Sequence, residues 1–435
     1  MYFAYSLLLA VGLIVALPYF AVKGLRHGKY WPNLAQRMGR LPRELGEAAA
    51  KSPGAIWIHA VSVGEVVAAA PLAAQLKQIF PQRRLIVSTT TIAGQRMARE
   101  RIAFADGWIY FPLDWALAVR RFFRAVRPAL VVILEVEIWP NFLRVARRQR
   151  VPVIFASARV SERSFRRYRR VRGFVRRVLR DASAFLAQTN EDAQRLRALG
   201  APAEIVSVGG NLKFDAPAPE RNALAEWLEK RREREQREPI IVAGSVVAGE
   251  EDVVLDAFAQ VRERHPGALL VLAPRKPERF AVAGDIAEMR GWGLARRSAM
   301  DFTQEFDRET GVLLLDTIGE LAGAYTAADL VFVGGSLAPA GGHNILEPAA
   351  LGKPPVFGRH MENFREIARR FLDAGAGVQV GTANELAGAW NRWMDDPCAR
   401  ETAGRAAKEL MERNRGALDR VIDRAAALLA TEEAK

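Results

Sequence analysis

The sequence predicts an α/β protein with two Rossmann-like, doubly wound parallel-sheet domains and an N-terminal membrane-anchor helix. Three observations predict this fold class. The chain has 435 residues, more than one hydrophobic core usually spans, so two domains are expected. From residue 55 onward, short apolar runs alternate with amphipathic stretches, which is typical of parallel sheets covered by helices on both faces. The first 22 residues carry no charged side chain.

Residues 1–22 are long and apolar enough to cross roughly 30 Å of hydrocarbon. Positive charges such as Lys23 and Arg26 follow the apolar run, whereas they precede it in a cleaved signal peptide. The positive-inside rule therefore predicts that everything after residue 23 lies on the cytoplasmic side of a membrane. Pro18 leaves a buried or interfacial helix open as the alternative.

The first domain is predicted over residues 23–213. Its expected strands are "AIWIHAV", "RLIVSTTT", "ALVVILEVE", "VPVIFASAR", "SAFLAQ" and "EIVSVGG", with helices between them. Prolines followed by dense charge mark residues 214–238 as a linker with a solvated helix.

The second domain is predicted over residues 239–398. Its expected strands are "PIIVAGS", "ALLVLAPR", "VLLLDT", "LVFVGGS" and "PPVFG". Residues 399–435 are expected to form a C-terminal helical tail. Because open parallel sheets bind ligands at the carboxyl ends of their strands, the functional residues are expected directly after strands, in a cleft between the domains.

Much of the formal net charge of +14 lies in an arginine-rich segment, residues 144–180, which holds a single acid, Glu162. Solvated helix faces normally mix charge signs, so this segment favours binding to anionic lipid headgroups or to a phosphorylated ligand, with nucleic acid as the rival partner. The arginines expected to contact the membrane surface or the phosphates of a ligand are Arg159, Arg163, Arg166, Arg167 and Arg170. The single cysteine, Cys398, indicates a reducing compartment.

In the second domain, "LVFVGGSLAPAGGHNILEPAALG" leads from a strand through a glycine-rich loop into a helix near Asn344. Open backbone N–H groups at Gly334, Gly335 and Ser336 predict a phosphate site that needs no metal, and tight turns are the purely structural alternative. Glu347, one turn into the helix, suits the hydroxyl groups of a ribose; a favourable contact with the helix dipole is its structural alternative.

Two cations are expected at the presumed cleft between the domains. Arg275 ends the strand in "LLVLAPRKPERF", where a guanidinium can bind a phosphate or a pyrimidine edge. Lys213, in "GGNLKFD", is expected where the two domains meet. His59 and His343 are either catalytic or satisfied core groups. The sequence holds no Asp-any-Asp pair, so neither a metal nor another cofactor is expected.

In the first domain, Glu65 directly follows a glycine in "HAVSVGEVVAAAPL", between an apolar strand and an alanine-rich helix. A carboxylate there is either a helix cap or a catalytic group. Ser62, Glu135 and Glu137 are the candidates to orient the base or bind an acceptor. The period of two in "VVILEVEIWPN" predicts that both glutamate side chains point the same way at the strand end.

Together these stretches resemble the family of 3-deoxy-manno-octulosonic acid (Kdo) transferases of lipopolysaccharide biosynthesis. The matching motifs are "HAVSVGE", "LEVEIWPN", "ASARVSERS", "GGNLKFD", "APRKPERF", "DTIGELAGAYTAADLVFVGGS" and "GGHNILEPAA", which cover nearly the whole chain. The resemblance implies a GT-B fold. It further implies an inverting, metal-independent enzyme that moves Kdo from CMP-Kdo to a lipid A precursor, lipid IVA.

The resemblance also implies roles for individual residues. Glu65 is implied as the catalytic base. CMP is implied to bind through residues of the second domain, namely Arg275, Gly334, Gly335, Ser336, Asn344 and Glu347. This chain has Ser245-Val246-Val247 where the family often has a Ser-Thr-His-like stretch, which leaves Ser245 as the polar donor contact there.

The expected partners are therefore CMP-Kdo, a lipid A precursor and anionic inner-membrane lipids. A transferase for another nucleotide sugar is the alternative within the same class. A membrane-tethered nucleic-acid-binding protein is the alternative from a different class. That second alternative leaves Glu65 and the glycine-rich loop unexplained, so no nucleic acid is expected.

Overall fold

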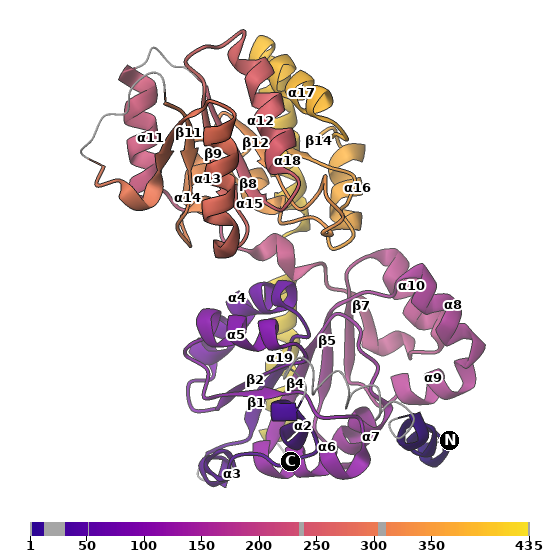
Figure 1. Cartoon of the computed structure of the whole chain (residues 1–435). Coiled ribbons are helices and arrows are strands. Elements are labelled where there is room, and N and C mark those ends of the chain that lie inside the picture. The colour runs from indigo at the N-terminus through magenta and orange to yellow at the C-terminus, as the bar shows by residue number, and fades with distance from the viewer. Residues whose placement is uncertain (1, 13–30, 51, 235–238, 303–309, 434–435) are drawn as a thin grey trace. The chain divides into compact units, whose positions relative to one another are not determined.

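The structure is a computed structural model that describes residues 2–12, 31–50, 52–234, 239–302 and 310–433 (Figure 1). The chain forms two compact units, each with its own parallel sheet, as the sequence predicts. Unit 1 comprises Met1–Ala216 and Asn414–Lys435, and unit 2 comprises Pro217–Arg413. The chain thus returns to unit 1 with its last helix.

The sheet of unit 1 has seven parallel strands in the order β3-β2-β1-β4-β5-β6-β7. The strands are β1 (Ala55–His59), β2 (Leu85–Thr89), β3 (Gly107–Tyr110), β4 (Pro128–Leu134), β5 (Val153–Ala158), β6 (Ala184–Ala187) and β7 (Val206–Val208). The helices are α2 (Trp31–Arg37), α3 (Arg43–Ala50), α4 (Val63–Ile79), α5 (Ile92–Arg101), α6 (Ala116–Val126), α7 (Pro140–Arg148), α8 (Glu162–Arg170), α9 (Arg172–Leu179), α10 (Asn190–Leu199) and α19 (Ala417–Glu433). The direction of strand succession reverses between β1 and β4, which is where such sheets bind ligands.

Both faces of this sheet are covered by apolar side chains. Trp57 of β1 packs in one cluster with Phe142 of α7, while its neighbour Ile58 packs on the other face with Leu72 of α4. Val421 of α19 belongs to that second cluster. The C-terminal helix therefore completes the core of unit 1, which explains why it leaves unit 2.

The sheet of unit 2 also has seven parallel strands, in the order β10-β11-β9-β8-β12-β13-β14. They are β8 (Ile240–Val246), β9 (Leu269–Pro274), β10 (Gly293–Arg296), β11 (Thr310–Leu314), β12 (Leu330–Val333), β13 (Pro355–Phe357) and β14 (Val378–Gln379). The helices are α11 (Ala223–Arg234), α12 (Glu251–Arg262), α13 (Phe280–Met289), α14 (Leu321–Ala327), α15 (Leu346–Ala350), α16 (Arg365–Asp373), α17 (Ala383–Asp395) and α18 (Pro397–Asn414). Here the strand order reverses between β8 and β12.

The structure differs from the sequence expectations in several elements. Strands β3, β10 and β14 were not predicted, because they are short edge segments whose side chains are mostly half-exposed or exposed. The helix expected to be solvated within the linker, α11, buries Leu224 and Leu228 in unit 2. The arginine-rich segment after β5 forms two helices, α8 and α9, which meet at Val171.

The first residues of the chain pack on unit 1. Residues 2–12 are helical, the hydroxyl of Tyr2 donates to Asp181 at 2.6 Å, and the guanidinium of Arg144 lies 4.3 Å from the centre of the Tyr2 ring. Among the described residues, no helix is both long enough and apolar enough to cross a membrane. Residues 13–22 of the expected anchor lie outside the described residues, so the anchor stays a prediction.

Candidate active site

Glu65 lies in the first turn of α4, directly past the carboxyl end of β1. Its Oε2 accepts the N–H of Val61 at 2.7 Å, and its Oε1 accepts the hydroxyl of Ser62 at 3.1 Å. Ser62 is the N-cap residue of α4, but its side chain makes no capping hydrogen bond to the helix. Glu65 thus holds the turn that enters the helix, and the Ser62 hydroxyl is in contact with its carboxylate.

The pKa of Glu65 is raised to about 7, chiefly because the side chain is removed from water. The negative charge of Glu135 raises the pKa further, and Glu137 adds a smaller contribution in the same direction. The hydrogen bonds from Val61 and Ser62 act in the opposite sense. A carboxyl group with a pKa near neutrality is suited to accept a proton at physiological pH.

The two acidic neighbours reach this place through a loop. Strand β4 ends at Leu134, and Glu135 takes a left-handed backbone conformation with φ +58°. The predicted alignment of Glu135 and Glu137 by a period of two assumes extended backbone, and this premise fails because the strand stops one residue before the first glutamate. Strained backbone of this kind is concentrated at functional sites.

Each acid also has a partner of its own. Oε1 of Glu135 lies 3.7 Å from Nζ of Lys213, so this lysine lies beside an acid of unit 1. Oε2 of Glu137 accepts the indole N–H of Trp139 at 3.1 Å and lies 3.6 Å from Nε2 of His59. We call Glu65, Glu135 and Glu137 the acidic cluster.

His59 is fully buried at the end of β1. Its Nδ1 lies 2.9 Å from the hydroxyl of Ser88, and its ring stacks on Phe111 with 3.8 Å between the ring centres. The His59 ring is thus packed in the core, and its Nε2 faces Glu137. The ring is buried, but its Nε2 makes no hydrogen bond to the described residues, so His59 is not a fully satisfied core group and its catalytic reading stays a prediction.

In unit 2, the glycine-rich loop after β12 differs from its expectation. The N–H of Gly334 donates to the C=O of Gly244 at 2.8 Å. The N–H groups of the next four residues all donate to the carboxylate of Glu250, at 2.7 Å from Gly335, 2.8 Å from Ser336, 2.7 Å from Leu337 and 3.2 Å from Ala338. These N–H groups already donate hydrogen bonds within the protein, so in this conformation they cannot donate to a phosphate as the sequence predicts.

Glu250 was missed by the sequence reasoning. It is fully buried and precedes α12, shortly after β8. The only signal was an acidic residue at the entrance to a helix after a strand, which usually indicates a cap. Ser245, at the end of β8, has φ +57° and lies in the same strand-end region.

The other predicted donor residues lie beyond the ends of β9 and β12. The N–H of Arg275 donates to the C=O of Val246 at 2.8 Å. Burial is the main reason why the pKa of His343 falls to about 4, and the positive charge of Arg275 lowers it further. His343 is therefore neutral at physiological pH, and its ring and the Arg275 guanidinium belong to one electrostatic environment.

Asn344 and Glu347 form a pair at the entrance to α15. The side-chain amide of Asn344 donates to Oε1 of Glu347 at 3.0 Å, and its Oδ1 accepts the N–H of Leu346 at 3.2 Å. The two predicted ribose or phosphate contacts are thus brought together and oriented by each other.

The predicted acceptor arginines lie on or next to α8 in unit 1. Arg163, Arg167 and Arg170 are exposed, and Arg159 is half-buried. Arg166 is exposed as well and donates to Glu162 at 2.9 Å. They form a cationic surface, as the composition predicted.

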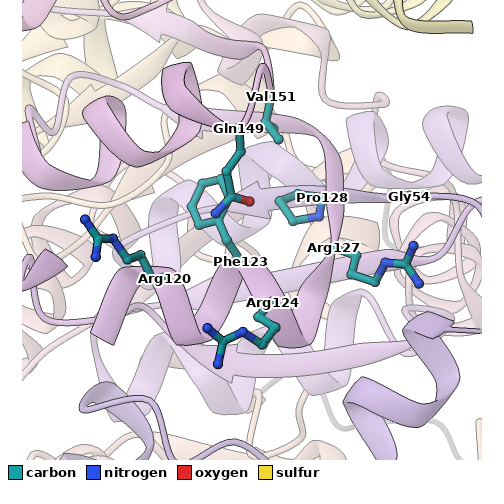
Figure 2. Close-up of a pocket in the computed structure, with 8 residues that line it drawn as sticks. All are labelled: Gly54, Arg120, Phe123, Arg124, Arg127, Pro128, Gln149 and Val151. Atoms are coloured by element: carbon teal, nitrogen blue, oxygen red, sulfur yellow. The ribbon is translucent and has the colours of Figure 1, made fainter. Parts of the chain in front are cut away.

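A separate pocket of about 600 Å³ lies at the amino end of β4 and is lined by Gly54, Arg120, Phe123, Arg124, Arg127, Pro128, Gln149 and Val151 (Figure 2). Figure 2 shows that the guanidinium groups of Arg120, Arg124 and Arg127 point in different directions, away from the Phe123 ring. The pocket also stands at the opposite end of β4 from Glu135. It is therefore not part of the acidic cluster.

Within the described ranges, no group of three or more His, Cys, Asp or Glu side chains is arranged to hold a metal ion.

Comparison with known proteins agrees with the motifs. A family model described as 3-Deoxy-D-manno-octulosonic-acid transferase (kdotransferase) matches residues 32–216. The 3-deoxy-D-manno-octulosonic acid transferase of Haemophilus influenzae is 34% identical over 426 residues, which cover 97% of each chain. The enzyme of the same name from Bordetella pertussis is 34% identical over 418 residues, which cover 92% of each chain.

Among solved structures, the UDP-GlcNAc 2-epimerase from Neisseria meningitidis bound to UDP-GlcNAc matches with a TM-score of 0.52. The match covers 83% of this chain and 99% of that chain at 16% identity, and it shows the fold alone. The paired parallel-sheet units are thus those of a GT-B-like protein. The extent and identity of the sequence matches show that the chain belongs to the family of 3-deoxy-D-manno-octulosonic acid transferases, which are glycosyltransferases.

Proposed function

We propose that the protein transfers Kdo from CMP-Kdo to a lipid A precursor with inversion at the anomeric carbon, and that Glu65 is the general base. The observation that carries this proposal is the acidic cluster at the switch point of unit 1. There, burial and Glu135 raise the pKa of Glu65 to about 7. An ordinary surface cap has no need of such an environment, whereas a base that must take a proton near neutral pH does.

The proposed reaction is a single displacement. A hydroxyl oxygen of the acceptor forms a bond to the anomeric carbon of Kdo while the bond from that carbon to the CMP phosphate oxygen breaks. The hydroxyl proton passes to Oε1 or Oε2 of Glu65, and CMP leaves with the electron pair of the broken bond. Because one bond forms opposite the bond that breaks, the configuration inverts.

The leaving phosphate gains negative charge in this step, and unit 2 is proposed to stabilise it. Arg275 supplies a full positive charge, and His343 is a neutral ring next to it. Preorganised groups of this kind stabilise developing charge more effectively than water does. The Asn344–Glu347 pair is proposed to bind the ribose hydroxyl groups, because a carboxylate held by an amide is a well-oriented acceptor.

Kdo transfer is tested by incubating the purified protein with CMP-Kdo and lipid IVA and counting the added sugars by mass spectrometry. We expect one or more Kdo residues on the acceptor and free CMP in equal amount. Consumption of a UDP-sugar with no reaction of CMP-Kdo would instead favour a transferase for another nucleotide sugar.

We further propose that unit 1 lies on the cytoplasmic face of the inner membrane. Two features support this. Phe3 and Leu8 are 82% and 72% exposed on the helix over residues 2–12, which suits contact with lipid. The exposed arginines of α8 suit anionic headgroups and the acceptor's phosphates.

The membrane proposal is tested by replacing Arg163, Arg167 and Arg170 together with glutamine. We expect weaker binding to anionic vesicles and a higher KM for the acceptor, with unchanged affinity for CMP. A matched variant replaces three exposed arginines of α5, namely Arg96, Arg99 and Arg101. Equal effects of the two variants, or no change in acceptor kinetics, would contradict a specific role for α8.

A further inference from the structure

Glu250 is a fully buried carboxylate that the proposed reaction does not use. Its Oε2 accepts N–H groups from Val247 at 3.0 Å and Gly335 at 2.7 Å, and its Oε1 accepts those of residues 336–338. Every one of these partners is a donor, and an ionised carboxylate is a pure acceptor, so the group and its surroundings match. Consecutive backbone N–H groups aimed at one point form a nest of the kind that binds external anions elsewhere. Here the anion is part of the chain.

The loop that Glu250 holds, residues 334–338, fixes the segment that carries His343. Gly335 has a left-handed backbone with φ +67°, and its C=O accepts the N–H of Gly342 at 2.7 Å. A Cβ atom at Gly335 would lie 2.5 Å from Cδ2 of His343, so the imidazole packs directly on this glycine. A shift of the loop would therefore move the imidazole.

The same loop is tied to the neighbouring strand. The hydroxyl of Ser336 accepts the N–H of Gly358 at 2.8 Å, just past β13, and its C=O accepts the N–H of His360 at 2.8 Å. The loop thus links β8, β12 and β13 at their carboxyl ends, and the Glu250 carboxylate lies at the centre of this link.

We propose that Glu250 is a positioning residue for the donor, an internal anion that fixes the 334–338 loop so that the His343 ring stands beside Arg275, where the nucleotide phosphate binds. This inference rests on the proposed function, because CMP-Kdo is the ligand whose binding it sets. The backbone and the side chains then have separate roles. The loop N–H groups hold Glu250, and side chains hold the phosphate. A loop that is fixed in advance costs less ordering when the donor binds.

The variant Glu250→Gln tests this role. Glutamine keeps the shape of the side chain but turns an NH₂ group toward backbone donors, so hydrogen bonds on one side of the group are lost. Because small displacements of positioning groups weaken ligand contacts strongly, we expect the KM for CMP-Kdo to rise about tenfold or more. The KM for the acceptor should stay within about twofold, since the altered loop belongs to the donor-binding unit.

Glu251→Gln is the matched control. Glu251 is the next residue, is equally buried, and pairs with Arg279 at 2.7 Å instead of with the loop. Its replacement removes a buried charge from the same turn of α12 and leaves the nest intact. A donor KM that is unchanged in Glu250→Gln, or that rises equally in both variants, would overturn the proposal. A merely structural role would reduce the active fraction, and thus kcat, without this split.

Amide hydrogen exchange supplies a second measurement that does not depend on activity or on the variant's folding. In the wild-type protein, the N–H groups of Leu337 and Ala338 should exchange as slowly as those of β12, although both residues are partly exposed. Exchange as fast as that of unbonded loop amides would refute the role of Glu250. In Glu250→Gln, the same amides should exchange about tenfold faster or more, because their acceptor is weakened.

Wild-type turnover separates the two proposals. Turnover of CMP-Kdo without a donor KM effect in Glu250→Gln overturns the positioning role alone. Slow exchange at the loop together with no turnover of CMP-Kdo overturns the proposed function, and the positioning role toward that donor with it.

Discussion

Two glutamates occupy corresponding places in the two units. Glu65 follows β1, and Glu250 follows β8, each at the point where the strand order of its sheet reverses. Glu65 accepts two hydrogen bonds and faces the negative charges of Glu135 and Glu137. Glu250 accepts five backbone N–H groups, from Val247 and residues 335–338.

The difference teaches that the partners of a carboxylate, and not its position in the fold, decide its chemistry. At Glu65, burial with few donors and with negative neighbours destabilises the anion, so the group binds a proton readily and can serve as a base. Many donors stabilise the anion and fix its surroundings, so the group organises backbone. The following predictions test the properties assigned to these two carboxylates.

The largest expected effect is on turnover by Glu65→Gln. Glutamine keeps the size of the side chain but cannot take the acceptor's proton, so kcat should fall by about two to four orders of magnitude. CMP affinity should remain, because Arg275, Asn344 and Glu347, which are proposed to bind the donor, are in unit 2. Steady-state kinetics at saturating substrates beside CMP titration calorimetry measure both quantities. A folded variant with near-wild-type kcat would return Glu65 to the role of a helix cap.

The second prediction concerns stability and pH at Glu65. The folded-state pKa is about 7 and the ordinary value is 4.5, so the folded protein binds more protons between these values. The stability contributed at this site is therefore lost as the pH rises from about 4.5 to about 7, by up to about 3 kcal/mol. Glu65→Gln should lack this loss and should be relatively more stable than wild type at pH 8 than at pH 4. Denaturant unfolding at both pH values measures it, and parallel pH profiles would contradict it.

The third prediction concerns the stability of Glu250→Gln. Loss of charge-assisted hydrogen bonds at a fully buried site should cost about 2 kcal/mol. For a unit of this size, the melting temperature should fall by about 4 to 8 °C. Thermal unfolding of Glu250→Gln beside Glu65→Gln at neutral pH tests the contrast directly. If both substitutions lowered the melting temperature equally, the two carboxylates would not differ as described.

The smallest expected effect is on the pH profile when a neighbour of Glu65 is changed. The base must be ionised, so kcat/KM should rise with pH around 7. Glu135→Gln removes a negative charge, which lowers the pKa of Glu65 and moves this rise to lower pH. Burial remains, so the rise stays above the ordinary range of a glutamate. Glu137→Gln should act in the same direction but less, and an unmoved profile in both variants would separate the acids from the base.

The two parallel-sheet units and most of their strands can be predicted from the amino-acid sequence alone. Periodicity and β-branched composition act over a few residues, so β1, β4, β8 and β12 can be read from "AIWIH", "PALVVIL", "IIVAGSV" and "LVFV". The motifs of the family resemblance indicated Glu65 as the base and the turn at residues 334–336 as part of a donor site, and both roles stay predictions. Short edge strands such as β14 and the burial of α11 escaped, because their stability depends on neighbours that local patterns do not contain.

The surroundings that distinguish the Glu65 carboxylate from the Glu250 carboxylate are visible only in the tertiary structure. Glu135, which raises the pKa of Glu65, comes from a different strand end, and its left-handed backbone breaks the alternation on which the sequence reasoning relied. The loop N–H groups that hold Glu250 lie 85 to 88 residues further along the chain. Parallel sheets bring distant strand ends to one edge, so the charges and donors around a group are set by strand order rather than by neighbouring sequence.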